Sequence, residues 1–71
     1  MKIMRKMSGA GDEQVAEWNE TTTPEALKAI EEEFKSLTAS GYFAADIDKN
    51  ELIREFDPNA NILMIPRMQG G

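Results

Sequence analysis

Residues 62–66 read ILMIP, and this run decides how the chain is expected to fold. Four consecutive apolar residues leave no polar face on a strand, which is typical of strands covered on both sides. Residues 2–7, KIMRKM, instead mix apolar and charged side chains, as expected where one face meets water. The two patterns predict a central position in a sheet for the last strand and a more exposed position for the first.

A helix is predicted after the run of three threonines. Thr22 or Thr23 can cap its first turn, and Pro24 suits the first helical position because no N–H is needed there. Ser40 and Gly41 provide a left-handed stop at the other end. Apolar residues recur between them at spacings of three and four, so we expect the helix to pack through one face. These residues are Leu27, Ile30, Phe34 and Leu37.

Short strand candidates separated by turn residues make up the rest of the chain. Residues 2–7 and 13–18 are expected to form an N-terminal β-hairpin, because the glycines between them allow the positive φ angles of a tight loop. Residues 42–48, YFAADID, form the next candidate and place Phe43, Ala45 and Ile47 on one face. Two polar turns then lead to the last candidates, which are residues 51–56, ELIREF, and residues 62–66.

The composition excludes many functions. The chain has 71 residues and neither cysteine nor histidine, so it lacks a disulfide framework, a thiol nucleophile and the commonest general base. A net charge of -5 repels phosphate backbones, and nucleic acid is not an expected partner. No stretch approaches the roughly 20 apolar residues of a membrane span, and none resembles a signal peptide. We therefore expect a cytoplasmic, monomeric protein that is not an enzyme, binds no cofactor and does not contact membranes.

Residues 46–57, DIDKNELIREFD, place acidic and amide side chains where a calcium loop has its first ligands. However, Glu51 stands at the sixth position, where the loop needs glycine, and Asp57 at the twelfth, where a longer glutamate is preferred. A polar turn between two strands is the better interpretation. No metal site is predicted.

Several large side chains are expected to fill the core. Trp18, at the end of the second strand candidate, is interpreted as a core or rim anchor rather than a ligand platform. Met4 or Met7, together with Met64, is interpreted as core filling, which is the usual role of methionine inside a domain.

The predicted order is strand, strand, helix, strand, strand, strand. An N-terminal hairpin, one helix packed on a mixed sheet and a central C-terminal strand describe an α+β fold of the β-grasp type, in which the first and last strands pair in parallel. Residues 1–66 are expected to form this domain, and residues 67–71 a flexible tail ending in Gly-Gly.

Residues 62–71, ILMIPRMQGG, resemble the C-terminal segment of ubiquitin-like β-grasp proteins, and most closely the sulfur carriers of thiamine and molybdopterin synthesis. Gly70 and Gly71 match the terminal diglycine of that family, and Pro66 matches its proline. Arg67 departs from the sulfur carriers, which commonly have a second proline there, and is similar to the basic residue near ubiquitin's diglycine. Two glycines at two given positions arise by chance in roughly one chain in 200.

The resemblance implies that an E1-like adenylating enzyme activates the carboxylate of Gly71, with ATP as its co-substrate. Glycine lacks a Cβ, so Gly70 and Gly71 could pass a narrow channel to the nucleotide. Pro66 would stiffen the exit from the sheet, and Arg67 and Met68 would contribute to recognition of the tail. With Gly71 last in the chain, we expect no protease to be needed to expose its carboxylate.

Three functions remain open. As a ubiquitin-like protein modifier, the chain would be joined through Gly71 to lysines of a target protein. As a sulfur carrier, it would form a thiocarboxylate at Gly71 and pass sulfur to an acceptor. As a β-grasp binding or structural module, it would not be conjugated at all. Arg67 and the charged helix favour the modifier, which we rank first, whereas Pro66 and the short chain favour the carrier.

Overall fold

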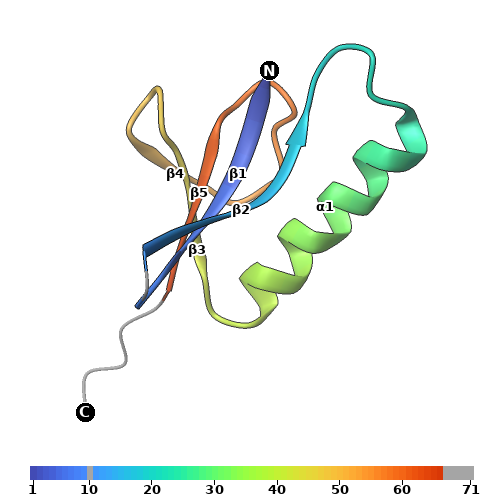
Figure 1. The fold of residues 1–71 in the computed structure, drawn as a ribbon. Coiled ribbons are helices and arrows are strands. Elements are labelled where there is room, and N and C mark those ends of the chain that lie inside the picture. The colour runs from blue at the N-terminus through green and yellow to red at the C-terminus, as the bar shows by residue number, and fades with distance from the viewer. Residues whose placement is uncertain (10, 67–71) are drawn as a thin grey trace.

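The computed structural model describes residues 1–9 and 11–66. Within them the chain forms β1 (Lys2–Ser8), β2 (Gly11–Trp18), α1 (Pro24–Ala39), β3 (Phe43–Asp46), β4 (Glu51–Ile53) and β5 (Ile62–Ile65). The five strands form one mixed sheet in the order β2-β1-β5-β3-β4, and α1 crosses one face of it (Figure 1). The protein is therefore a small α+β domain with a helix on a sheet. In the part of the chain described here, no helix has the length and apolar character needed to cross a membrane.

Strand β5 lies in the middle of the sheet, as its apolar run predicts. It pairs in parallel with β1, where Met4 lies opposite Ile62, and antiparallel with β3, where Phe43 lies opposite Ile65. Figure 1 shows the blue and orange strands side by side, although they come from opposite ends of the chain. Central pairing on both sides fixes the direction in which the chain leaves the sheet after β5.

The ends of α1 are set by the residues that the sequence indicates. Thr23 is the N-cap, and its hydroxyl accepts a hydrogen bond from Ala26 N at 3.2 Å. Pro24 occupies the first turn, and the helix ends before Ser40. Gly41 follows with a φ of 103°, a conformation that side chains with a Cβ rarely adopt.

The core lies between α1 and the sheet. Trp18 is 3% exposed, and its indole N–H donates to Pro58 O at 2.8 Å, so the buried ring leaves no polar atom unpaired. Its role as a core anchor is confirmed. The largest fully buried side chains come from β1, α1 and β5, and they are Met4, Phe34, Ile62 and Met64.

Strand β4 is shorter than predicted, because it ends at Ile53 instead of continuing to residue 56. The chain turns away so that the partly buried Phe56 packs against the core, where its ring centroid lies 5.2 Å from that of Trp18 and 5.9 Å from that of Phe34. Packing of an aromatic ring and two further ladder hydrogen bonds stabilise a fold by similar amounts, about 1 to 3 kcal/mol, so the ring contacts can offset the shorter strand. The end of β4 therefore coincides with the packing of Phe56 against the core.

Candidate functional site

The candidate site is the end of the sheet at which β5 finishes. Pro66 follows β5 directly and is exposed. The other predicted site residues, which are Arg67, Met68, Gly70 and Gly71, lie outside the described residues, and their roles and the predicted flexibility of residues 67–71 stay predictions. What can be described is the surface from which they continue.

Two other segments meet β5 at this end. Because β1 runs parallel to β5, with Lys6 opposite Met64, the turn between β1 and β2 lies beside the end of β5. Because β3 runs antiparallel to β5, its first residue, Phe43, lies opposite Ile65. Figure 1 shows this turn and the end of the orange strand at the same edge of the molecule. A partner that bound the chain beyond Pro66 would therefore also meet these segments.

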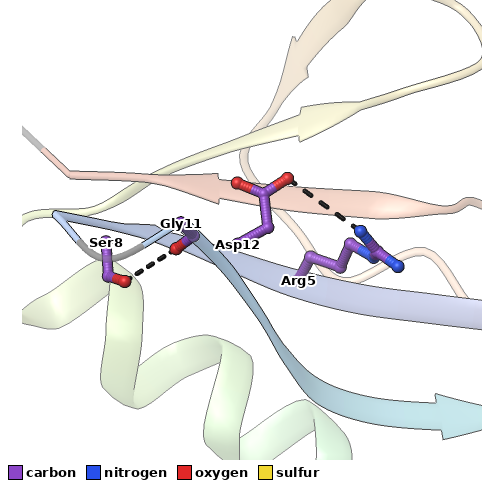
Figure 2. Close-up of polar contacts among 4 residues, drawn as sticks. All are labelled: Arg5, Ser8, Gly11 and Asp12. Carbon is purple, nitrogen blue, oxygen red and sulfur yellow. Dashed lines mark hydrogen bonds and ion pairs between the residues drawn. The ribbon is translucent and has the colours of Figure 1, made fainter.

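The β1–β2 hairpin is held by polar contacts near its turn (Figure 2). Ser8 Oγ donates to Gly11 O at 2.7 Å, and an Arg5 guanidinium nitrogen lies 4.0 Å from an Asp12 carboxylate oxygen. Lys6 and Glu13 make a second cross-strand ion pair at 3.9 Å. Exposed ion pairs of this kind contribute about 0 to 1 kcal/mol each to the free energy of unfolding. Their main effect here is therefore to neutralise charge near the turn.

The face of the sheet opposite α1 is apolar over β5, β3 and β4. The strand register places Arg5, Leu63, Ala45 and Leu52 in one row across four strands, with Phe43 and Ile65 in the next row. Leu52 is 67% exposed and Phe43 is 46% exposed. We call Phe43, Ala45, Leu52, Leu63 and Ile65 the outer apolar face.

The prediction that both faces of β5 are covered is wrong for the outer one. Ile62 and Met64 point toward α1 and are fully buried, whereas Leu63 and Ile65 are only half-buried between neighbouring side chains of the sheet. The physical reason is that the described chain has one helix, and a single helix can cover only one face. An apolar strand with one open face leaves a surface suited to contact with another molecule.

Strand β3 turns its less apolar side to the core. Phe43 and Ala45 share a face, as predicted, but it is the outer face, while Ala44 and Asp46 are buried on the helix side. The Asp46 carboxylate accepts hydrogen bonds from the backbone N–H groups of Asp48 and Lys49 at 3.0 and 3.1 Å. This carboxylate therefore stabilises the turn at residues 47–50, which confirms the predicted polar turn between two strands, while residues 51–53 of the same stretch form β4.

Asn61 has a role that its sequence context does not indicate. Its side-chain oxygen accepts from Ile3 N at 3.1 Å, its amide donates to Asp48 Oδ2 at 2.9 Å, and its backbone oxygen accepts from Ile47 N at 2.9 Å. These bonds join the start of β1, the β3–β4 turn and the start of β5. An asparagine directly before a buried strand was the signal available, but only the fold reveals what it contacts.

The buried polar groups of the described residues are satisfied within the domain. Across residues 1–9 and 11–66, no three acidic side chains gather in a way that could hold a metal ion. Within the same residues, every buried side-chain nitrogen or oxygen has a hydrogen-bond partner. The arrangement can present the chain beyond Pro66 next to the hairpin turn and the outer apolar face.

Comparison with known proteins gave no relative: no family model, no curated protein and no solved structure matched the chain.

Proposed function

We propose that this chain is a ubiquitin-like β-grasp protein that modifies other proteins through the carboxylate of Gly71. One observation carries the proposal. Strand β5 lies between β1 and β3, runs parallel to β1 and is followed by the exposed Pro66, and Gly71 comes five residues after Pro66 in the sequence. A diglycine this close in sequence to an exposed strand end supports the use of Gly71 by an enzyme.

The proposed chemistry uses the enzyme's groups and this chain's carboxylate. The Gly71 carboxylate attacks the α-phosphorus of ATP on an E1-like adenylating enzyme, giving an acyl-adenylate and pyrophosphate. A thiolate of that enzyme displaces AMP to form a thioester, and a lysine amine of the target protein then displaces the thiolate to form an isopeptide bond. Gly70 allows the carboxylate to reach the nucleotide, because it adds no Cβ to the narrow passage.

The body of the domain would supply the remaining contacts. The outer apolar face begins beside the exit of β5, at Phe43 and Ile65, so one partner can contact both that face and the chain beyond Pro66. Proline restricts φ to about -65°, which would limit the directions in which Arg67 and Met68 leave the sheet. Both features favour a partner that holds the domain while acting on Gly71.

The sulfur carrier is the second candidate, and the exposed Pro66 directly after β5 favours it, since this position matches that family's proline. In that case a sulfur donor, rather than a lysine amine, would complete the reaction at the activated carbonyl. The product would be a thiocarboxylate at Gly71, and the sulfur acceptor would be a metabolite.

The test is ATP–pyrophosphate exchange with the adenylating enzymes purified from the native host. Deleting Gly71 is expected to abolish exchange, while Lys49→Ala, in the β3–β4 turn at the far end of the sheet, leaves exchange unchanged. Undiminished exchange in the deletion variant would refute the use of Gly71. Circular dichroism of both variants checks that the fold is kept.

Intact-mass and peptide analysis of the protein isolated from its host then separates the candidate functions. Gly71 joined to lysines supports the modifier, and sulfur in place of one carboxylate oxygen supports the carrier. A free carboxylate under every growth condition contradicts both and leaves the unconjugated binding or structural module.

A further inference from the structure

The two edges of the sheet differ in how well they are protected. Edge strand β2 carries polar side chains along most of its length, and its register shifts between Met4 and Arg5, where Val15 is the extra residue. Bulges and charged side chains are the usual protection of an edge strand against further pairing. Edge strand β4 pairs with β3 without a register shift, and although it is short and begins with the charged Glu51, its central residue, Leu52, is apolar and 67% exposed.

The backbone of β4 is open along its outer side. Its three residues pair with β3, with Leu52 opposite Ala45, and the described part of the chain places no strand on their other side. Beyond the β3 pairing, no backbone group of Glu51, Leu52 or Ile53 is bonded to any other described residue. These unpaired N–H and C=O groups can accept one more strand.

A groove of about 340 Å³ adjoins this open edge. It is formed where the end of α1, the start of β3 and the end of β4 meet, and its walls include Tyr42, Phe43, Leu52 and Ile53. The walls are mostly apolar, and the volume is enough for one or two aliphatic side chains. A strand added to β4 would place alternate side chains toward the groove, because side chains alternate along a strand.

Arg54 adds a charge to the wall of the groove. Arg5, Lys6 and Lys35 each have an acidic partner within 4.0 Å, whereas no carboxylate among the described residues lies that close to Arg54. Lys2, Lys28 and Lys49 also lack such a partner among the described residues, but of these cations only Arg54 lines the groove. The groove therefore complements a segment that is apolar and also carries a carboxylate.

We propose that β4 and this groove bind an extended, apolar peptide segment of a partner protein, which adds to the sheet beside β4 and places an aspartate or glutamate on Arg54. The backbone of β4 supplies the pairing, the groove takes apolar side chains, and Arg54 sets the preference for an acidic residue. The length of β4 limits pairing to about three to five residues, so we expect micromolar or weaker affinity for an isolated peptide. The proposal does not depend on the chemistry at Gly71.

The experiment is an NMR titration of the isotope-labelled full chain with capped seven-residue peptides. The peptides alternate valine and serine, with one aspartate placed at each position in turn, and a matched set carries lysine instead. We expect aspartate peptides to shift the amide signals of Leu52, Ile53 and Arg54, and to give cross-strand contacts between the peptide backbone and β4. Arg54→Glu is expected to weaken the best aspartate peptide about fivefold, as an exposed ion pair allows, and to strengthen its lysine counterpart.

Two variants at exposed apolar positions serve as a matched pair. Leu52→Lys places a charge at the centre of β4 and is expected to abolish binding, whereas Met7→Lys, on β1, leaves it unchanged. The proposal is overturned if the peptides shift amide signals of β2 instead of β4, or if no peptide at millimolar concentration shifts the signals of β4. It is also overturned if Arg54→Glu changes the affinity for the aspartate and lysine peptides equally. Shifts at β4 that depend on the concentration of the chain alone would instead indicate self-association, and would also overturn it.

Discussion

Leu63 and Met64 are neighbours on β5 whose side chains lie on opposite faces of the sheet, and this makes them a matched pair. Met64 is fully buried under α1, and Leu63 is half-buried on the outer apolar face. Truncating a buried methionine to alanine costs about 2 to 5 kcal/mol, because it loses both transfer energy and packing around a cavity. Truncating a half-buried leucine, with solvent able to fill the space, costs only about 1 kcal/mol.

The difference is large for a domain of this size. Small domains have stabilities near the lower end of the range of about 5 to 15 kcal/mol, so Met64→Ala is expected to remove about half or more of the free energy of unfolding. With a urea m-value of about 1 kcal/mol/M, the unfolding midpoints of Met64→Ala and Leu63→Ala should differ by about 2 M. Trp18, the single tryptophan and 3% exposed, provides the fluorescence signal, because unfolding transfers it to water.

Equal losses of stability in the two variants would refute the conclusion that one face of β5 is open. That result would mean that Leu63 is as well covered in solution as Met64. Repeating the urea titration at several protein concentrations identifies the reason. If a second copy of the chain covers Leu63, the unfolding midpoint depends on protein concentration. If only Leu63→Ala lost stability, the core would have to lie on the opposite side of the sheet from the one described here.

Two further predictions concern hydrogen bonds that hold the termini of elements. Asp46→Ala removes a buried acceptor of two backbone N–H groups and is expected to cost about 2 kcal/mol in urea unfolding. Asp46→Asn keeps an acceptor oxygen and should recover most of that loss. Equal costs would show that an acceptor oxygen at this position does not account for the stability of the turn. Thr23→Ala removes the N-cap of α1 and should cost about 1 kcal/mol, measured by thermal unfolding followed at the helical signal, while Thr23→Ser keeps the cap. Identical melting of the alanine and serine variants would contradict the capping role.

The elements that the sequence predicts well are those defined by neighbouring residues. The cap at Thr23 and the stop at Gly41 act within one helical turn, so composition and spacing suffice to place α1. The end of β4 is different, because it depends on Phe56 reaching rings from β2 and α1. No local pattern in residues 51–56 distinguishes a strand that continues from one that turns inward.

Some features of the candidate site are likewise visible in the sequence, and others only in the fold. The diglycine and Pro66 can be recognised in the sequence, and so can the direction of the strand before them. The groove beside β4 cannot, because its walls come from segments near residues 38, 42 and 53 that are joined only in the fold. The open edge at Leu52 also follows from strand order, which pattern alone does not determine for so short a strand.

By itself, the sequence determined the order of the elements, the ends of the helix and the central place of residues 62–65. Only the tertiary structure decided which side of the sheet the helix covers, and therefore that Ala44 and Asp46 are buried while Phe43 and Leu52 face outward. The physical reason is that the alternation of side chains along a strand fixes which residues share a face, but not which face is covered. That choice is made by packing between distant segments, and here it leaves an apolar surface beside the end of β5.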